Sequence, residues 1–162
     1  MELYFKDNFF SAGETPILDA EGQSIGAIDL QSMLTATLTI YGPDSAPRYT
    51  GKFPFFSRKW EITDAGGHIV GVLRSKLTFF SKRYEYDAGS RGIFYIESPA
   101  FSYSYTILNA YEKEIASFEK TSHWLQAGAF CLSNHSEELE SYELIAVVMG
   151  VQSIQKTANN GA

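Results

Sequence analysis

The sequence predicts a single-domain, mainly β protein: a closed antiparallel β-barrel of repeated hairpins around a buried, apolar C-terminal helix. Three observations support this prediction: short runs of alternating apolar and polar residues, glycine-containing turns between those runs, and a wholly apolar stretch near the C-terminus. The chain has 162 residues, of which 44% are hydrophobic and 20% are charged. This balance is typical of one folded domain and excludes an intrinsically disordered chain.

Alternating residues identify the strands, because residues spaced by two lie on the same face of a strand. In residues 101–107, aromatic and aliphatic residues alternate with serine and threonine, and residues 34–40 show the same pattern. One face of each strand is then buried and the other is exposed. In chain order, strands are predicted at residues 34–40, 60–63, 68–80, 82–86, 93–97, 101–107, 114–120 and 124–132.

Turn signals separate these stretches. Residues 19–22, 64–67 and 87–89 each begin with aspartate and end with glycine, and residues 42–44 and 109–110 occupy equivalent places elsewhere. Aspartate accepts local backbone hydrogen bonds, and glycine adopts positive φ without steric cost. A strand, a tight turn and a second strand form a β-hairpin.

The hairpins are predicted to repeat. The tripeptide Phe-Phe-Ser occurs at residues 9–11, 55–57 and 79–81, and the second and third copies are 24 residues apart. The first and second copies are 46 residues apart, about twice that interval. Chance recurrence of two common residue types is the alternative interpretation. A meander of repeated hairpins needs closure to protect its edge strands, which favours a barrel.

A helix is predicted near the C-terminus. Asn134 or Ser136 is a suitable N-cap, and four glutamates between residues 137 and 143 suit the first turns of a helix. Leu144–Val151 is apolar on every side, so the helix must be enclosed. Eight residues rise only about 12 Å, too short for a bilayer core of about 30 Å, and we therefore expect burial in protein. A strand is the alternative, since several of these residues are β-branched.

The sequence also resembles a known family. Residues 4–11, which read Tyr-Phe-Lys-Asp-Asn-Phe-Phe-Ser, the repeated hairpins and the terminal apolar helix are similar to the LURP-one-related family, in particular to its small bacterial members. The resemblance covers residues 1–156, which we expect to form one domain, with residues 157–162 as a polar tail. It depends on the order and spacing of the motifs, because each single motif is degenerate.

The resemblance implies a tubby-like fold, in which about a dozen antiparallel strands close around a central C-terminal helix. Relatives by fold include the Tubby C-terminal domains, which bind phosphoinositides, and the phospholipid scramblases. The bacterial branch has no assigned chemistry. No phosphoinositide-contacting residue can be assigned to a position here, because no local motif matches. The cysteine cluster and membrane-length helix of the scramblases are absent from this sequence.

Positive charge is concentrated in the middle of the chain. The net charge is −6, yet residues 52–91 hold eight basic and only four acidic residues. Because Arg58-Lys59 and Lys82-Arg83 each follow a Phe-Phe-Ser copy, we expect the two pairs to lie at the same level of adjacent hairpins. Such a basic rim is a candidate site for phosphate groups, and ordinary solvated surface is the alternative. The candidate ligand-binding residues are Lys52, Arg58, Lys59, Arg74, Lys76, Lys82, Arg83 and Arg91.

No residue pattern indicates catalysis. Cys131 lies near His123 and His135 along the chain, but its apolar neighbours indicate a core strand rather than a nucleophile. His68 is expected in a turn, and the glutamates between residues 137 and 143 are expected to be a charge run at the helix entry rather than an acid/base pair. The single cysteine excludes an intramolecular disulfide. We therefore expect a non-enzymatic protein without a metal site or cofactor.

The leading functional prediction is a tubby-like module that binds an anionic lipid headgroup, a phosphorylated small molecule or a protein partner. The alternative is a structural or protein–protein interaction domain with no small ligand. A carrier that binds a ligand inside the barrel is disfavoured, because the helix fills the interior. The net charge argues against nucleic acid as a partner. Without a signal sequence or transmembrane segment, the expected location is cytoplasmic, with peripheral attachment to a membrane as a further expectation.

Overall fold

The computed structural model describes residues 1–31, 37–77, 82–99, 102–122 and 128–161. Within these ranges, twelve strands precede one α-helix, α1 (Ser141–Asn160), and a 3-10 helix, η1 (Gly89–Arg91), separates β8 from β9. The strands are β1 (Glu2–Phe5), β2 (Gly13–Leu18), β3 (Ser24–Leu30), β4 (Leu38–Tyr41), β5 (Pro47–Lys52), β6 (Trp60–Asp64), β7 (Ile69–Leu77), β8 (Lys82–Asp87), β9 (Ile93–Ser98), β10 (Tyr105–Leu108), β11 (Glu114–Lys120) and β12 (Phe130–Asn134).

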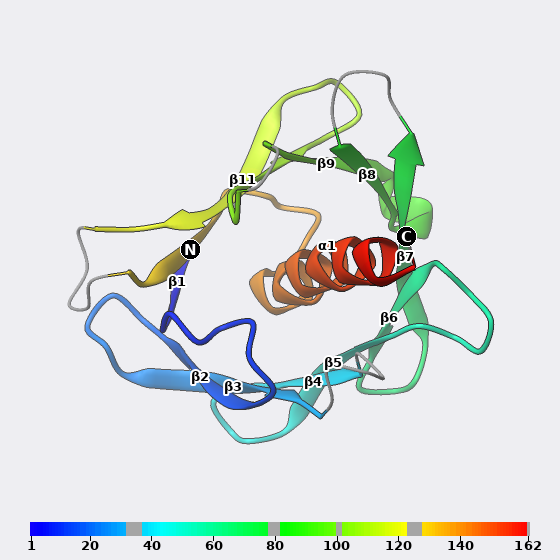
Figure 1. Cartoon of the computed structure of the whole chain (residues 1–162). Helices are drawn as coiled ribbons and strands as arrows, with labels where there is room; N and C mark the ends of the chain where they lie inside the picture. The colour runs from blue at the N-terminus through cyan, green and yellow to red at the C-terminus, as the bar shows by residue number, and fades with distance from the viewer. Residues whose placement is uncertain (32–36, 78–81, 100–101, 123–127, 162) are drawn as a thin grey trace.

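The twelve strands form one closed antiparallel sheet, which confirms the predicted barrel (Figure 1). Each strand pairs with its neighbours in sequence, and β1 closes the ring by pairing with both β2 and β12. At this closure Phe5 lies opposite Phe130, and Tyr4 lies opposite Leu18. An open sheet would leave unpaired backbone groups along its edge strands. Closure of the hairpin meander pairs these groups instead.

The alternating strand direction gives the barrel two different ends. The turn end holds the connections β2–β3, β4–β5, β6–β7, β8–β9 and β10–β11. The opposite loop end holds the β1–β2 and β5–β6 connections, residues 6–12 and 53–59. Two of the three Phe-Phe-Ser copies therefore lie at the loop end, and the third copy, residues 79–81, lies outside the described residues.

The turns predicted from aspartate, asparagine and glycine are present at the turn end. Asp64 Oδ1 accepts hydrogen bonds from the backbone N–H groups of Gly66 and His68, each at 2.9 Å. Asn109 Oδ1 accepts two such bonds in the β10–β11 turn. Gly67 has a φ of 81°, a conformation that side chains with a Cβ disfavour. The histidine at position 68 is thus part of a turn, as predicted.

The strand predictions were incomplete in two ways. They omitted β1, β2, β3 and β5, of which β2 and β5 contain proline, a residue disfavoured in strands. They also extended β4, β7, β10 and β12 too far, because residues 37, 68, 102–104 and 128–129 are not in strands. The remaining predicted strand residues, 34–36, 78–80, 101 and 124–127, lie outside the described residues.

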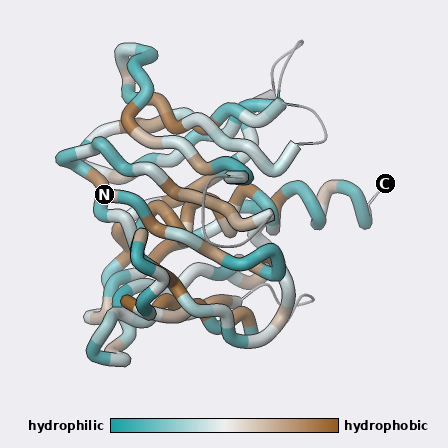
Figure 2. The backbone as a smooth tube through the Cα atoms, turned by 90° about the vertical axis from the view of Figure 1, so that its left-hand side faces the viewer, coloured by the Kyte–Doolittle hydropathy of each residue, from teal (hydrophilic) through white to brown (hydrophobic). Residues whose placement is uncertain are grey.

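Helix α1 passes through the interior of the barrel, which confirms the predicted buried helix (Figure 1). Every residue from Leu144 to Val151 is buried, and Val147 is completely shielded from solvent. Trp60 Nε1 on β6 donates a hydrogen bond to the carbonyl oxygen of Ala146 at 3.2 Å. The interior predicted to exclude a ligand is therefore occupied by protein. Figure 2 shows the C-terminal part of α1 protruding beyond the strands, where residues 157–161 are exposed.

The helix begins later than the sequence predicted. The N-cap is Glu140, which makes no side-chain capping hydrogen bond, so the prediction of Asn134 or Ser136 as N-cap is wrong. These two residues instead hold the loop before the helix. Ser136 Oγ accepts from the backbone N–H of Leu139 at 3.0 Å, and Asn134 Nδ2 donates to the Leu139 carbonyl at 2.9 Å. Of the four glutamates, only Glu143 lies in the first turn of α1.

Replacing Val147 by aspartate tests the enclosure of α1. The substitution places a carboxylate in an apolar environment where no partner can reach it, so it should lower the free energy of unfolding by about 4 kcal/mol or more. Thermal and urea denaturation of the purified variant measure this loss. As a control, deletion of residues 157–162 should leave the melting temperature nearly unchanged, because these residues have little to bury. A soluble Val147→Asp variant with wild-type stability would contradict the enclosure.

Candidate functional site

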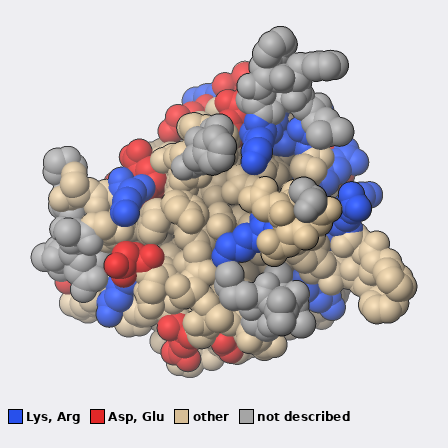
Figure 3. All heavy atoms as spheres, viewed as in Figure 1, with Lys and Arg blue, Asp and Glu red and all other residues tan. Residues whose placement is uncertain are grey.

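The eight basic residues predicted to bind a ligand do not form one patch. Arg91 lies in η1 at the turn end, so its inclusion in a rim with the other seven is wrong. The other seven lie on β5, β7 and β8 or in the β5–β6 loop. Figure 3 views the barrel from the loop end and shows lysine and arginine gathered on its right-hand side, over the region of β6–β8 in Figure 1.

Two of the seven, Arg74 and Lys76, are neutralised by a carboxylate on the neighbouring strand. Arg74 donates to Glu85 on β8 from Nε at 3.0 Å and also from a terminal nitrogen. Lys76 Nζ donates to the other oxygen of Glu85 at 3.2 Å. Hydrogen bonds from Arg74 and then Lys76 hold the pKa of the Glu85 carboxyl below its usual value. These contacts make the pair part of the sheet surface rather than an unoccupied anion site.

Arg83 is also neutralised within the protein. Its guanidinium donates to Glu112 at 2.6 Å and lies 3.8 Å from an oxygen of Glu97. It also stacks over the ring of Tyr95, 4.2 Å from the ring centroid. Two carboxylates and an aromatic face neutralise this cation, while its buried Nε makes no hydrogen bond within the described part of the chain. Arg83 therefore joins strands β8 and β9 to the β10–β11 turn.

Four cations remain, and all of them are exposed: Lys52, Arg58, Lys59 and Lys82. We call them the loop-end cations. Among the described residues, none of the four is within ion-pair distance of a carboxylate. Lys52 ends β5, Arg58 and Lys59 lead into β6, and Lys82 begins β8. Glu61 lies opposite Lys52 in the β5–β6 ladder and is the nearest acid in sequence to this group.

The loop-end cations share an end of the barrel but not one level along its strands. Trp60 lies opposite Leu73, which lies opposite Tyr86, so these three residues mark one level on β6, β7 and β8. Lys82 is four residues from Tyr86, or about 13 Å further along β8. Lys59 is adjacent to Trp60. The expectation that the two basic pairs lie at one level is therefore wrong, because the strands of a barrel are staggered.

Two exposed phenylalanines lie between these cations in the β5–β6 loop. Phe55 is 88% exposed and Phe56 is 94% exposed, and their ring centroids are 4.1 Å apart. Below them, Phe53 packs edge-on against Trp60 with ring centroids 5.1 Å apart. In the sequence, these phenylalanines indicated only the Phe-Phe-Ser repeat. Their position directly after Pro54 and before Arg58-Lys59 was the signal for an exposed loop.

The first Phe-Phe-Ser copy has a different environment. Phe9 is buried, and Phe10 packs against Tyr103, with ring centroids 5.2 Å apart, and Phe130, with ring centroids 5.7 Å apart. Neighbouring loops at that part of the barrel supply aromatic partners, whereas the β5–β6 loop has none around its tip among the described residues. The same tripeptide therefore forms core in one loop and surface in another.

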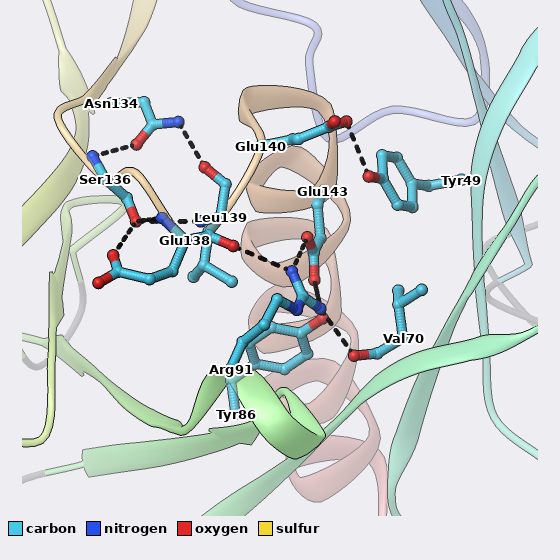
Figure 4. A network of polar contacts seen from close by, with 10 residues as sticks. All are labelled: Tyr49, Val70, Tyr86, Arg91, Asn134, Ser136, Glu138, Leu139, Glu140 and Glu143. Carbon is cyan, nitrogen blue, oxygen red and sulfur yellow. Dashed lines mark hydrogen bonds and ion pairs between the residues drawn. The ribbon is translucent and has the colours of Figure 1, made fainter.

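The turn end holds a buried polar network around Arg91 and Glu143 (Figure 4). Arg91 donates to both oxygens of the Glu143 carboxylate, at 2.7 and 2.8 Å, and also to the carbonyl of Val70 at 2.8 Å. Tyr86 donates its hydroxyl hydrogen to the same carboxylate. The Glu143 side chain is only 1% exposed. Glu143, predicted as part of a helix-entry charge run, does lie in the first turn of α1, where it is buried against Arg91.

The titration properties of this network are those of a structural ion pair. Hydrogen bonding to Glu143 raises the pKa of the Arg91 guanidinium above its usual value, so it stays charged. Burial, followed by the charge of Glu143, raises the pKa of Tyr86, so its hydroxyl stays protonated. Both oxygens of Glu143 are engaged by these two groups. A cavity of about 480 Å³ adjoins the Arg91–Glu143 pair.

Cys131, considered above as a nucleophile, is buried on β12. Burial raises the pKa of the Cys131 thiol, which disfavours the thiolate needed for nucleophilic attack. Its sulfur lies 3.7 Å from Ser133 Oγ. His135 is exposed, and His123 lies outside the described residues. In the described part of the chain, no three His, Cys, Asp or Glu side chains gather as a metal site would require.

The closed barrel around a C-terminal helix is a tubby-like fold. The X-ray structure of protein AT5G01750 from Arabidopsis thaliana, which has a LURP-one/tubby-like fold, is similar with a TM-score of 0.61. The match covers 98% of this chain and 90% of that chain at 10% sequence identity, so it shows the fold alone. No family model and no curated protein matches the sequence. In the described ranges, no helix has the length and apolar character to cross a membrane.

Replacing Arg91 by alanine tests the structural role of the Arg91–Glu143 pair. The variant leaves the buried Glu143 carboxylate without its cation, so the free energy of unfolding should fall by about 3 kcal/mol. Urea denaturation provides the measurement. The matched control is Arg48→Ala, which breaks the exposed Arg48–Asp44 pair at the same end of the barrel. That change should cost less than about 1 kcal/mol.

A double replacement, Arg91→Met with Glu143→Leu, separates charge from packing. It removes both charges together and should recover most of the stability lost in Arg91→Ala. Equal destabilisation by Arg91→Ala and Arg48→Ala would show that the buried pair has no special role.

Proposed function

We propose that this protein is a non-enzymatic, LURP-one-related module that binds phosphate-bearing anions through the loop-end cations. One observation carries the proposal. Of the eight basic residues in the central segment, the four that make no ion pair among the described residues are all exposed and lie at the same end of the barrel. The other four are neutralised by the protein's own carboxylates.

The electrostatics of the surface support this assignment. Neighbouring cations repel one another, and a bound anion would relieve that repulsion. Arg58 offers a planar fork that can donate two parallel hydrogen bonds to a phosphate, and the lysines add point charges. The chain as a whole carries a net charge of −6. This overall negative charge disfavours broad nucleic-acid binding, so attraction of anions depends on local clusters of cations.

The surroundings of two reactive side chains support a non-enzymatic role. The Glu143 carboxylate is held by Arg91 and Tyr86, and the Cys131 thiol is buried with a raised pKa. Neither group is poised to exchange a proton or attack a substrate. The alternative function, a protein–protein interaction domain without a small ligand, is favoured by the exposed aromatic pair, Phe55 and Phe56.

Charge reversal at the β5–β6 loop tests anion binding. The double variant Arg58→Glu/Lys59→Glu should bind inorganic polyphosphate at least roughly tenfold more weakly than the wild type, because two attractive charges become repulsive. Isothermal titration calorimetry at low salt gives the affinities. Wild-type binding should also weaken as salt rises, since exposed charges are screened within about 8–10 Å.

The matched control is Lys113→Glu, which reverses an exposed lysine in the β10–β11 turn at the other end of the barrel. It should bind polyphosphate as the wild type does. If the wild type binds no polyphosphate at low salt, or if Lys113→Glu is as damaging as the loop variant, the anion site does not exist. The interaction-domain alternative would then be the better account.

A further inference from the structure

The exposure of Phe55 and Phe56, the 55–56 tip, has no explanation in the folding of this protein. Both rings are almost fully exposed, and burial is what makes phenylalanine stabilise a fold. Single exposed hydrophobic residues are common, but two adjacent aromatic rings at the end of one loop form a continuous apolar surface. This surface is suited to contact something outside the chain.

The backbone of the tip supports the same conclusion. Phe56 has a φ of 59°, in the left-handed region that glycine and asparagine occupy more readily than residues with a bulky side chain. Neither the exposed ring nor the positive φ adds to the stability of the native state. A phenylalanine in this position is therefore better explained by a contact that the isolated chain does not make.

The tip is held in a defined position relative to the barrel. At its base, Phe53 packs against Trp60, which is itself fixed in the core by its hydrogen bond to Ala146. The loop is further closed by hydrogen bonds from Ser57 N–H to the Pro54 carbonyl at 2.9 Å and from Lys59 N–H to Ser57 Oγ at 3.0 Å. Its two exposed rings are thus presented by an anchored turn.

Cations surround the base of the tip. Lys52 precedes the loop, Arg58 and Lys59 follow the rings by two and three residues, and all three are exposed. An apolar tip with cations behind it matches the cross-section of an anionic bilayer, in which acyl chains lie below a layer of negative headgroups. Rings at the tip would reach the acyl boundary while the cations stay at the headgroup level.

We propose that the 55–56 tip inserts into the surface of an anionic bilayer while the loop-end cations bind the headgroup phosphates. This inference rests on the proposed function, because the same cations bind the phosphate. A membrane fits better than a protein partner for a reason of size. Two phenylalanine side chains bury at most about 300–500 Å², below the roughly 800 Å² per partner of a stable protein interface. Reversible membrane attachment needs only a small insertion supported by charge.

The test compares binding to vesicles with binding to a soluble anion. The variant Phe55→Ser/Phe56→Ser should bind phosphatidylcholine–phosphatidylserine vesicles at least about tenfold more weakly than the wild type, because two buried rings are lost. Its affinity for inorganic polyphosphate should stay unchanged. The control is Tyr111→Ser, which removes an aromatic ring that is 90% exposed at the turn end. This control should bind the vesicles normally.

A Phe55→Trp variant reports insertion directly. On addition of the same anionic vesicles, its fluorescence should shift to the blue and be quenched by brominated acyl chains, whereas the fluorescence of Tyr111→Trp should show neither change. Vesicle binding by Phe55→Ser/Phe56→Ser equal to that of the wild type would overturn insertion and leave anion binding intact. Failure of the wild type to bind either vesicles or polyphosphate would overturn both proposals. Self-association lost only in the double-serine variant, without vesicle binding, would identify the tip as a protein contact instead.

Discussion

The structure depends on the filling of the closed sheet by α1. A twelve-stranded barrel encloses more space than its own inward side chains occupy, so the strands alone would surround a void. The contact of α1 with Trp60 shows how close the fit is. A Cβ added at Gly51 on β5 would lie 2.4 Å from the Trp60 ring, and one at Gly150 on α1 would lie 2.5 Å from it. Two glycines therefore let one large ring join strand and helix.

The internal helix carries a buried carboxylate, Glu143, which Arg91 neutralises. The first turn of α1 carries the acid Glu143 into the barrel, where a charge without a partner would be costly. Arg91 reaches it from η1 and also donates to the Val70 carbonyl, so the strand, the turn and the helix are joined at one guanidinium. A basic residue close in sequence to surface cations thus neutralises a buried carboxylate.

The sequence was informative where periodicity or turn chemistry is local. It predicted the aspartate turns and the buried segment Leu144–Val151, because each follows from neighbouring residues. It predicted the closed sheet because a meander of hairpins needs protection of its edge strands. It did not predict β5, whose Pro47 and Gly51 disfavour a strand but suit pairing beside Trp60. It also could not separate neutralised from unpaired cations, since Glu85, Glu97 and Glu112 approach them only through strand register and barrel closure. The Phe-Phe-Ser copies at residues 9–11 and 55–57 differ in burial, because long-range packing decides which rings are covered.

The two barrel ends differ in how fully the fold satisfies their side chains. At the turn end, aspartate side chains hold the turn backbone and Arg91 pairs with the buried Glu143. At the loop end, the loop-end cations and the 55–56 tip have neither ionic nor apolar partners among the described residues. Exposed apolar surface and positive charge occur together at the β5–β6 loop. Their combination on one anchored loop has a simple common explanation, an external surface that is both apolar and negatively charged.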